Sequence, residues 1–295
     1  MKINKQSNVY TLVYIVVLVV FVGTLLAVTS MSLKDKQKKN ADADKMKQIL
    51  ASVHIAATDA NVKEVYDRLI VETPVVNAQG QLIGNDAFNI DVQAQSKIQN
   101  YGQRKLPVYV CDLGAKGRKY IIPAYGSGLW GPIWGYIAVN DDGSTIYGAY
   151  FAHQGETPGL GAEIEKPAFC NQFDGKELFQ AGIFLPVAVV KKGQRAPDGR
   201  DYVDAVSGGT ITSKGVSAML DDCLKPYKAY LEQVRETRRI IKFEDDSRVQ
   251  ITALEELGAA ESEEATGLFE PDNENEEGVA ESEPTDEPTD EPTEE

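Results

Sequence analysis

Cysteine and histidine are scarce in this chain of 295 residues, which has three cysteines and two histidines. Cys111, Cys170 and Cys223 lie far apart, and none has the C-x-x-C spacing of a zinc or iron–sulfur site, so no metal site built by this chain alone is predicted. We expect the thiols to be small buried apolar groups. With only His54 and His153 available, a histidine-rich metal site is excluded, and a Ser-His-Asp triad would have to use one of these two.

Basic residues are missing from the last part of the chain. No Lys or Arg occurs from Thr252 to Glu295, whereas 18 of the 45 acidic residues lie there. The rest of the chain has 27 acidic and 30 basic residues, so the formal net charge of −15 comes from this segment. Its repeats of the Glu-Pro-Thr-Asp type cannot bury enough apolar surface to fold, which predicts a disordered acidic tail at 252–295. Elsewhere no basic stripe is interleaved with aromatic residues, and nucleic-acid binding is not expected.

Charge is absent from the 23 residues between Val9 and Met31, which form an almost unbroken apolar run. As a helix this run would be roughly 35 Å long, enough to cross the hydrocarbon core of a bilayer. A cleaved signal peptide is the alternative, but it would have a shorter apolar region and a small-residue cleavage site, and the residues after Ala27 form a poor one. We therefore expect a polar stub at 1–8 and one retained transmembrane helix at 9–31.

The lysines nearest to this run are unevenly divided: Lys2 and Lys5 precede it, and Lys34, Lys36, Lys38 and Lys39 follow it. By the positive-inside rule, this count alone would place the large C-terminal part of the chain in the cytoplasm.

Helical spacing of apolar residues follows the membrane segment. One such pattern runs from Met46 to Val53, within an expected linker helix at 32–57, and a second runs from Val62 to Leu69 with Asp59 as the expected N-cap.

From Val75 onward the pattern changes to that of strands. Hairpins are predicted within 75–83, 107–123 and 133–151, the last with a strong Asp142-Gly143 turn signal. A strand at 187–190 and a helix from about Thr212 follow. The order of helices, antiparallel strands and helix predicts an α+β domain at 58–245.

Two glycine-rich segments border the clearest hairpin. Gly126 to Gly135 contains both tryptophans, four glycines and a proline, and His153 to Gly161 follows a predicted strand. Glycine allows a backbone or a flat ligand to approach closely, although a β-turn with packed tryptophans is the alternative for the first segment. His153 could act as a base, but no nucleophile is linked to it by spacing.

A third segment, Asp204 to Leu220, passes from a Ser-Gly-Gly turn through three hydroxyls to an apolar helical pattern. The first N–H groups of a helix have no partner within the helix, so a phosphate is a natural ligand at such a turn. The alternative is an N-cap and a turn without a ligand. Together the three segments predict a ligand pocket.

These segments resemble a known family. Gly128-Leu-Trp-Gly-Pro-Ile-Trp-Gly-Tyr136, His153-Gln-Gly-Glu-Thr-Pro-Gly-Leu-Gly-Ala-Glu-Ile164 and Asp204-Ala-Val-Ser-Gly-Gly-Thr-Ile-Thr-Ser213 are similar to the C subunit of the bacterial Na⁺-translocating NADH:quinone oxidoreductase. The resemblance covers the anchor and most of residues 35–235. It implies that Thr210 carries FMN through a phosphoester, attached by a flavin transferase.

The resemblance also implies the residues of the site. Asp204, Ser207, Gly208 and Gly209 would complete the flavinylation motif, with Gly209 standing where the family usually has alanine. Thr157 and Leu160 would lie close to the isoalloxazine ring. The full set of expected cofactor-binding residues is Gly128, Trp130, Glu156, Thr157, Pro158, Gly159, Leu160, Gly161, Ser207, Gly208, Gly209, Thr212 and Ser213.

The resemblance further implies a place in the cell. The chain would be one of six subunits in the bacterial inner membrane and would relay electrons from NADH toward ubiquinone or menaquinone during sodium export. Its N-terminal stub would be cytoplasmic and its flavin domain periplasmic, against the lysine count. Two alternatives stay open: a protein like the G subunit of the Rnf complex, and a non-redox, membrane-anchored extracytoplasmic binding module.

Overall fold

The computed structural model describes residues 8–196 and 198–244. The chain divides into two compact units, residues 1–241 and 242–295, and only the helical residues 242–244 of the second are described. The predicted acidic tail at 252–295 therefore lies outside the described residues.

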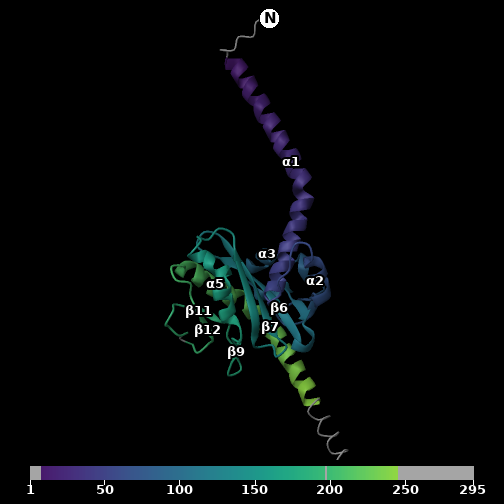
Figure 1. The fold of residues 1–295 in the computed structure, drawn as a ribbon, viewed down its shortest axis with the longest axis vertical. Helices are drawn as coiled ribbons and strands as arrows, with labels where there is room; N and C mark the ends of the chain where they lie inside the picture. The colour runs from purple at the N-terminus through teal and green to yellow at the C-terminus, as the bar shows by residue number, and fades with distance from the viewer. Residues whose placement is uncertain (1–7, 197, 245–295) are drawn as a thin grey trace, which may run out of the picture. The chain divides into compact units, whose positions relative to one another are not determined.

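A five-stranded antiparallel sheet forms the centre of the first unit (Figure 1). Its strand order is β1-β5-β6-β7-β8, from β1 (Ile70–Glu72) through β5 (Tyr109–Asp112), β6 (Arg118–Ser127) and β7 (Pro132–Asn140) to β8 (Ile146–His153). The hairpins predicted within 107–123 and 133–151 are confirmed as β5–β6 and β7–β8.

The β7–β8 turn shows why its sequence signal was strong. Asp142 accepts hydrogen bonds from the N–H groups of Ser144 and Thr145, both at 2.8 Å, and Gly143 has a φ of 63°. Glycine adopts that left-handed conformation without the steric cost of a side chain.

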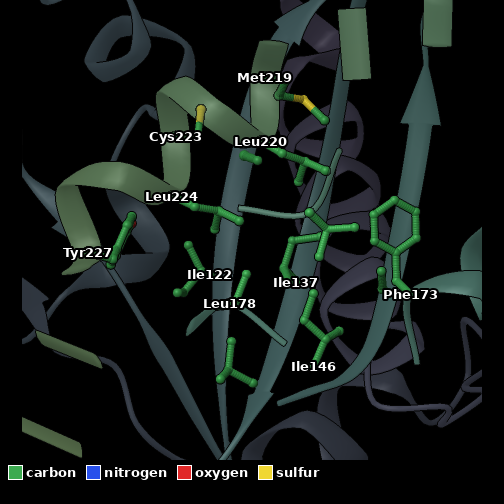
Figure 2. Close-up of a cluster of buried hydrophobic side chains, with 14 of the residues drawn as sticks. Ile122, Ile137, Ile146, Phe173, Leu178, Met219, Leu220, Cys223, Leu224 and Tyr227 are labelled. Carbon is green, nitrogen blue, oxygen red and sulfur yellow. The ribbon is translucent and has the colours of Figure 1, made fainter. Parts of the chain in front are cut away.

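Helices cover both faces of the sheet, because successive residues of a strand point to opposite sides. Ile122 and Ile137 lie in the core beneath α5 (Thr210–Leu224), as Figure 2 shows, whereas their neighbours Ile121 and Tyr136 lie in the core beneath α1 (Asn8–Ala51) and α2 (Val62–Leu69). This three-layer arrangement confirms the predicted α+β class, and Figure 1 shows α5 and α2 on opposite sides of β6 and β7.

The membrane segment and the predicted linker helix form one element. α1 runs without a break from Asn8 to Ala51, and it is the one helix in the described part of the chain that is long and apolar enough to cross a membrane. Its apolar N-terminal half is exposed, whereas Ile49 and Leu50 near its C-terminal end are fully buried against the sheet.

The start of α2 differs from the prediction that Asp59 caps it. The residue before the helix is Asn61, and its side chain accepts hydrogen bonds from Thr58 instead of capping the helix. Asp59 forms an ion pair with Lys47 of α1. Because α2 begins at Val62, three residues after Asp59, the Asp59 side chain is not in the capping position.

The remaining elements are short. The hairpin predicted within 75–83 is confirmed as β2 and β3, and the strand predicted at 187–190 is confirmed as β11, which pairs in parallel with β12. These elements are β2 (Val75–Val76), β3 (Leu82–Gly84), β4 (Leu106–Pro107), β9 (Phe179–Gln180), β10 (Ile183–Phe184), β11 (Ala188–Val190), β12 (Tyr202–Asp204), α3 (Val92–Ser96) and α4 (Pro167–Cys170). Residues 228–244 are also helical.

Candidate functional site

Three segments far apart in sequence meet at the end of the sheet where β6 and β8 end and β7 begins. The turn between β6 and β7, the loop after β8 and the first turn of α5 enclose a cavity of about 210 Å³. Ser127 pairs with Pro132 and Ile133 pairs with His153, so the first two segments lie at the same end of the sheet. The residues that line the cavity are Leu129, Glu156, Thr157, Leu160, Gly161, Gly208, Gly209, Thr210, Ile211 and Thr212.

The start of α5 faces this cavity. The helix begins at Thr210, two residues before the predicted start, because the Gly209 carbonyl already accepts from the N–H of Ser213 at 2.8 Å. The N–H groups of Thr210, Ile211 and Thr212 donate to no acceptor among the described residues, and the first turn has no acidic side chain. Unpaired donors and the positive end of the helix dipole together suit an anion.

The three hydroxyls of this turn have different surroundings. Thr212 and Ser213 are each only 1% exposed, whereas Thr210 is exposed. The Thr212 hydroxyl donates to the Glu156 carboxylate at 2.5 Å, and the Ser213 hydroxyl accepts from the N–H of Val206 at 3.1 Å. Thr210 is therefore the accessible hydroxyl of the turn.

Glu156 is the buried carboxylate of the site, with 4% of its surface exposed. One oxygen accepts from the N–H of Trp130 at 2.8 Å and the other accepts from Thr212. Burial acts to raise the pKa of Glu156, but the hydrogen bonds from Thr212, Trp130 and the N–H of Leu129 outweigh it and hold the pKa below its ordinary value. The carboxylate is thus held in its charged form.

An apolar rim surrounds the mouth of the cavity. Leu129 is 48% exposed, Leu160 44% and Ile211 56%, and all three line the cavity. Leu129 and Ile211 are absent from the predicted site residues. A signal for Ile211 was available, because an apolar residue at this position falls outside the apolar face formed by Val216, Met219 and Leu220.

Some predicted site residues lie elsewhere. Asp204 ends β12 and lines a different, open cavity of about 610 Å³ together with Lys176 and Arg195. Ser207, Pro158, Gly159 and Ser213 do not line the cavity of Thr210, and Ser213 is buried. Gly128 lies behind Glu156, where a Cβ atom would come within 2.5 Å of the carboxylate, and Trp130 contributes its backbone N–H.

His153 and Trp134 do not line the cavity of Thr210. His153 accepts a hydrogen bond from the N–H of Glu156 at 3.2 Å through Nδ1, and its Nε2 lies 3.6 Å from the Glu165 carboxylate, so it supports the loop instead of facing a nucleophile. Trp134 donates to Gln48 of α1 at 2.9 Å and thereby helps to attach that helix to the sheet.

Comparison with known proteins identifies the domain. Residues 128–225 match the family model of the FMN-binding domain, a span that includes all three segments of the site. The C subunit of the Na⁺-translocating NADH-quinone reductase from Vibrio parahaemolyticus is 33% identical over 245 residues, which cover 74% of this chain and 91% of that protein.

Two solved structures agree with the fold. The crystal structure of the same C subunit from Parabacteroides distasonis is 48% identical, with a TM-score of 0.63 over 68% of this chain and 96% of that one. The structure of NqrC from Shewanella oneidensis, at 22% identity and a TM-score of 0.56, supports the fold alone. The resemblance drawn from the sequence is confirmed, and the chain belongs to the NqrC family, the C subunit of the Na⁺-translocating NADH-quinone reductase, an oxidoreductase complex, with an FMN-binding domain.

Proposed function

We propose that this chain holds FMN covalently, through a phosphoester to the hydroxyl of Thr210. The observation that carries the proposal is the exposed hydroxyl on the first residue of α5, beside backbone N–H groups that have no acceptor among the described residues. A phosphate esterified at this position would be met by those N–H groups and by the positive end of the helix dipole.

Two glycines let the turn before Thr210 pack closely against the loop after β8. Gly208 has a φ of 76°, a conformation that side chains rarely adopt, and a Cβ atom there would come within 2.5 Å of Leu160. Gly209 is the residue before the helix and has no side chain to fill the turn. A Cβ atom at Gly209 would meet Val206 at 3.2 Å and Gly161 at 3.3 Å, so the glycine that stands where the family usually has alanine relieves a tight contact within the turn.

The apolar rim suits the remainder of the cofactor. Leu129, Leu160 and Ile211 offer exposed apolar surface beside Thr210, where a flat aromatic ring system would remove them from water. FMN would supply the electron-transfer chemistry when bound, and the residues of the chain would position it and exclude water.

Within the complex, the chain would relay electrons from NADH toward quinone in a process coupled to sodium export. The apolar part of α1 would anchor it in the inner membrane, with the flavin domain on the periplasmic side, where a flavin transferase would modify Thr210. Five other subunits would complete the assembly. Membership of the family supports the place in the complex, and α1, the helix in the described part of the chain that is long and apolar enough to cross a membrane, supports the anchoring.

Flavin fluorescence on a denaturing gel tests the covalent bond. The full chain, coexpressed with a flavin transferase, should give a fluorescent band, and the Thr210→Ala variant should give none. Thr237→Ala is the matched control, since Thr237 lies on the helix at 228–244, outside the site. Fragment-ion mass spectrometry of the peptide should then place the FMN mass on residue 210 and not on Thr212 or Ser213.

The outcomes separate the alternatives. A dark wild-type band without the FMN mass would contradict the proposal and favour a non-redox binding module. A flavinylated chain that copurifies with Rnf subunits instead of the NADH-quinone reductase would keep the chemistry but assign the alternative complex.

A further inference from the structure

Glu156 is an unusual charge for the interior of a small domain. Its carboxylate is buried and forms no ion pair with any described residue, although its electrostatic interaction with the neighbouring His153 acts to lower the pKa of Glu156. Buried carboxylates are normally paired or neutral, because removing a charge from water is costly. Hydrogen bonds stabilise this one instead: the N–H groups of Trp130 and Leu129 and the hydroxyl of Thr212 all point at it.

The space around the carboxylate is made by glycine. A Cβ atom at Gly128 would lie 2.5 Å from one carboxylate oxygen, and a Cβ atom at Gly161 would collide with the other oxygen and with the Thr212 hydroxyl. In the space that these glycines leave, the Glu156 side chain joins the β6–β7 turn to the first turn of α5. These are two of the three segments that enclose the cavity.

The charge of Glu156 also lies at the positive end of α5. The first turn of this helix has no acidic residue of its own, and Glu156 supplies that charge from a distant loop through Thr212, the third residue of the helix. A phosphoester on Thr210 would bring more negative charge to the same helix end. Each added electron on a flavin beside these groups would then be opposed by a fixed, poorly screened negative charge.

We propose that Glu156 is a positioning residue that clamps the walls of the flavin cavity and, as a fixed negative charge, lowers the reduction potential of the bound flavin. This inference rests on the proposed function, because it requires a flavin at Thr210. The clamp is carried by the hydrogen bonds to Trp130 and Thr212, and the effect on potential is carried by the buried, unpaired charge that lines the cavity.

The midpoint potential of the flavinylated full chain tests the effect of the charge. Glu156→Gln keeps the shape of the side chain and removes its charge, so the midpoint potential measured by reductive titration against reference dyes should shift upward. Glu177→Gln removes an exposed carboxylate outside the site and should leave the potential unchanged. A flavin-loaded Glu156→Gln chain with the wild-type potential would overturn the proposal.

If Glu156→Gln takes up no flavin, Thr212→Val tests the effect of the Glu156 charge on the midpoint potential instead. This variant keeps the carboxylate but removes a hydrogen bond to its charged form, which raises the pKa of Glu156. Its midpoint potential should therefore rise more between pH 8 and pH 5 than that of the wild-type chain. Equal pH dependence in the two proteins would count against a charged Glu156 beside the flavin.

The clamp can be measured without any cofactor, which separates its failure from that of the proposed function. In the chain made without the transferase, hydrogen exchange of the backbone N–H groups of Leu129 and Trp130 reports on the turn that Glu156 holds. Glu156→Leu should speed exchange at these two N–H groups because the turn is released, and Glu156→Gln, which keeps an acceptor oxygen, should not. Unchanged exchange in the leucine variant would refute the clamp.

Discussion

Gly215 shows how single residues set the approach of α5 to the sheet. A Cβ atom at this position would collide with the carbonyl oxygen of Ser127 at the end of β6. The contact is with backbone, which cannot rotate out of the way, so the helix itself would have to move. Glycine is thus needed for close packing here, although it is a poor helix former.

We predict that Gly215→Ala lowers the free energy of unfolding by about 1–3 kcal/mol, because the cost of overpacking exceeds the gain in helix propensity. Gly155→Ala is the control, since nothing lies within 4 Å of its Cβ position and its φ is not left-handed. The control should stay within about 0.5 kcal/mol of the wild-type chain. Urea titration followed by circular dichroism measures both, and equal stability of the two variants would contradict the packing argument.

Burial of the three thiols predicts that they react slowly. Burial raises the pKa of Cys111, Cys170 and Cys223 to about 11, so the reactive thiolate is almost absent at neutral pH. We predict that the native chain reacts slowly with a thiol reagent at pH 8 and releases three equivalents after denaturation in urea. Rapid labelling of the native chain would contradict the burial described for these side chains.

Among the elements, α5 is held by an ion pair from a buried arginine as well as by its apolar face. Arg104 is only 4% exposed, and its guanidinium pairs with the Asp222 carboxylate of α5 at 2.9 Å while donating to the carbonyls of Ile98 and Ser96. The chain that follows α3 is thereby tied to the helix that carries Thr210.

Removal of the Arg104 side chain should destabilise the fold by about 1–3 kcal/mol, because its charged hydrogen bonds to the carbonyls of Ile98 and Ser96 and to the partly exposed Asp222 carboxylate are lost. Arg118→Ala is the matched control, because its pair with Glu72 is about half exposed on both sides and such pairs contribute about 0–1 kcal/mol. Thermal unfolding of Arg104→Ala and Arg118→Ala compares them. Similar melting temperatures would contradict the distinction.

The elements that the sequence predicted well are those fixed by neighbours in the chain. The β7–β8 hairpin follows from alternating residues and the Asp142-Gly143 turn, and the apolar face of α5 follows from Val216, Met219 and Leu220. The parallel pairing of β11 with β12 and the cap of α2 were not predictable in the same way. Both depend on partners brought together by the fold, such as Lys47 for Asp59.

The functional site likewise combines features that neighbours in the chain determine with features that depend on the fold. Its three segments could be recognised from glycine content and motif, but the contact of Glu156 with Thr212 joins residues 56 positions apart. The exposure that separates Thr210 from Thr212 and Ser213 likewise depends on the helix starting two residues early. A local sequence pattern therefore predicts neither the contact between Glu156 and Thr212 nor the exposure of Thr210.

At the scale of the whole molecule, two signals disagree about the side of the membrane that holds the domain. The lysine count after the apolar run favours the cytoplasm, and the family resemblance favours the periplasm. Because we expect the native thiols to be inert, a cysteine introduced at an exposed position reports on location without background.

We predict that Lys192→Cys, in the exposed loop between β11 and β12, is labelled by a membrane-impermeant maleimide in intact spheroplasts. Labelling that occurs only in inverted vesicles would place the domain in the cytoplasm and would support the lysine count instead. The unmodified chain, tested in parallel, should stay unlabelled in both preparations.

The unbroken course of α1 has a mechanical consequence. Between Met31, the last residue of the apolar run, and Ile49, buried under the sheet, the helix rises by about 27 Å without a joint. A helix resists twisting because its backbone hydrogen bonds would have to break. Rotation of the apolar part of α1 in the membrane would therefore rotate the whole domain with it. Thr210 would change its position relative to the membrane, which a flexible linker between the helix and the domain would not require.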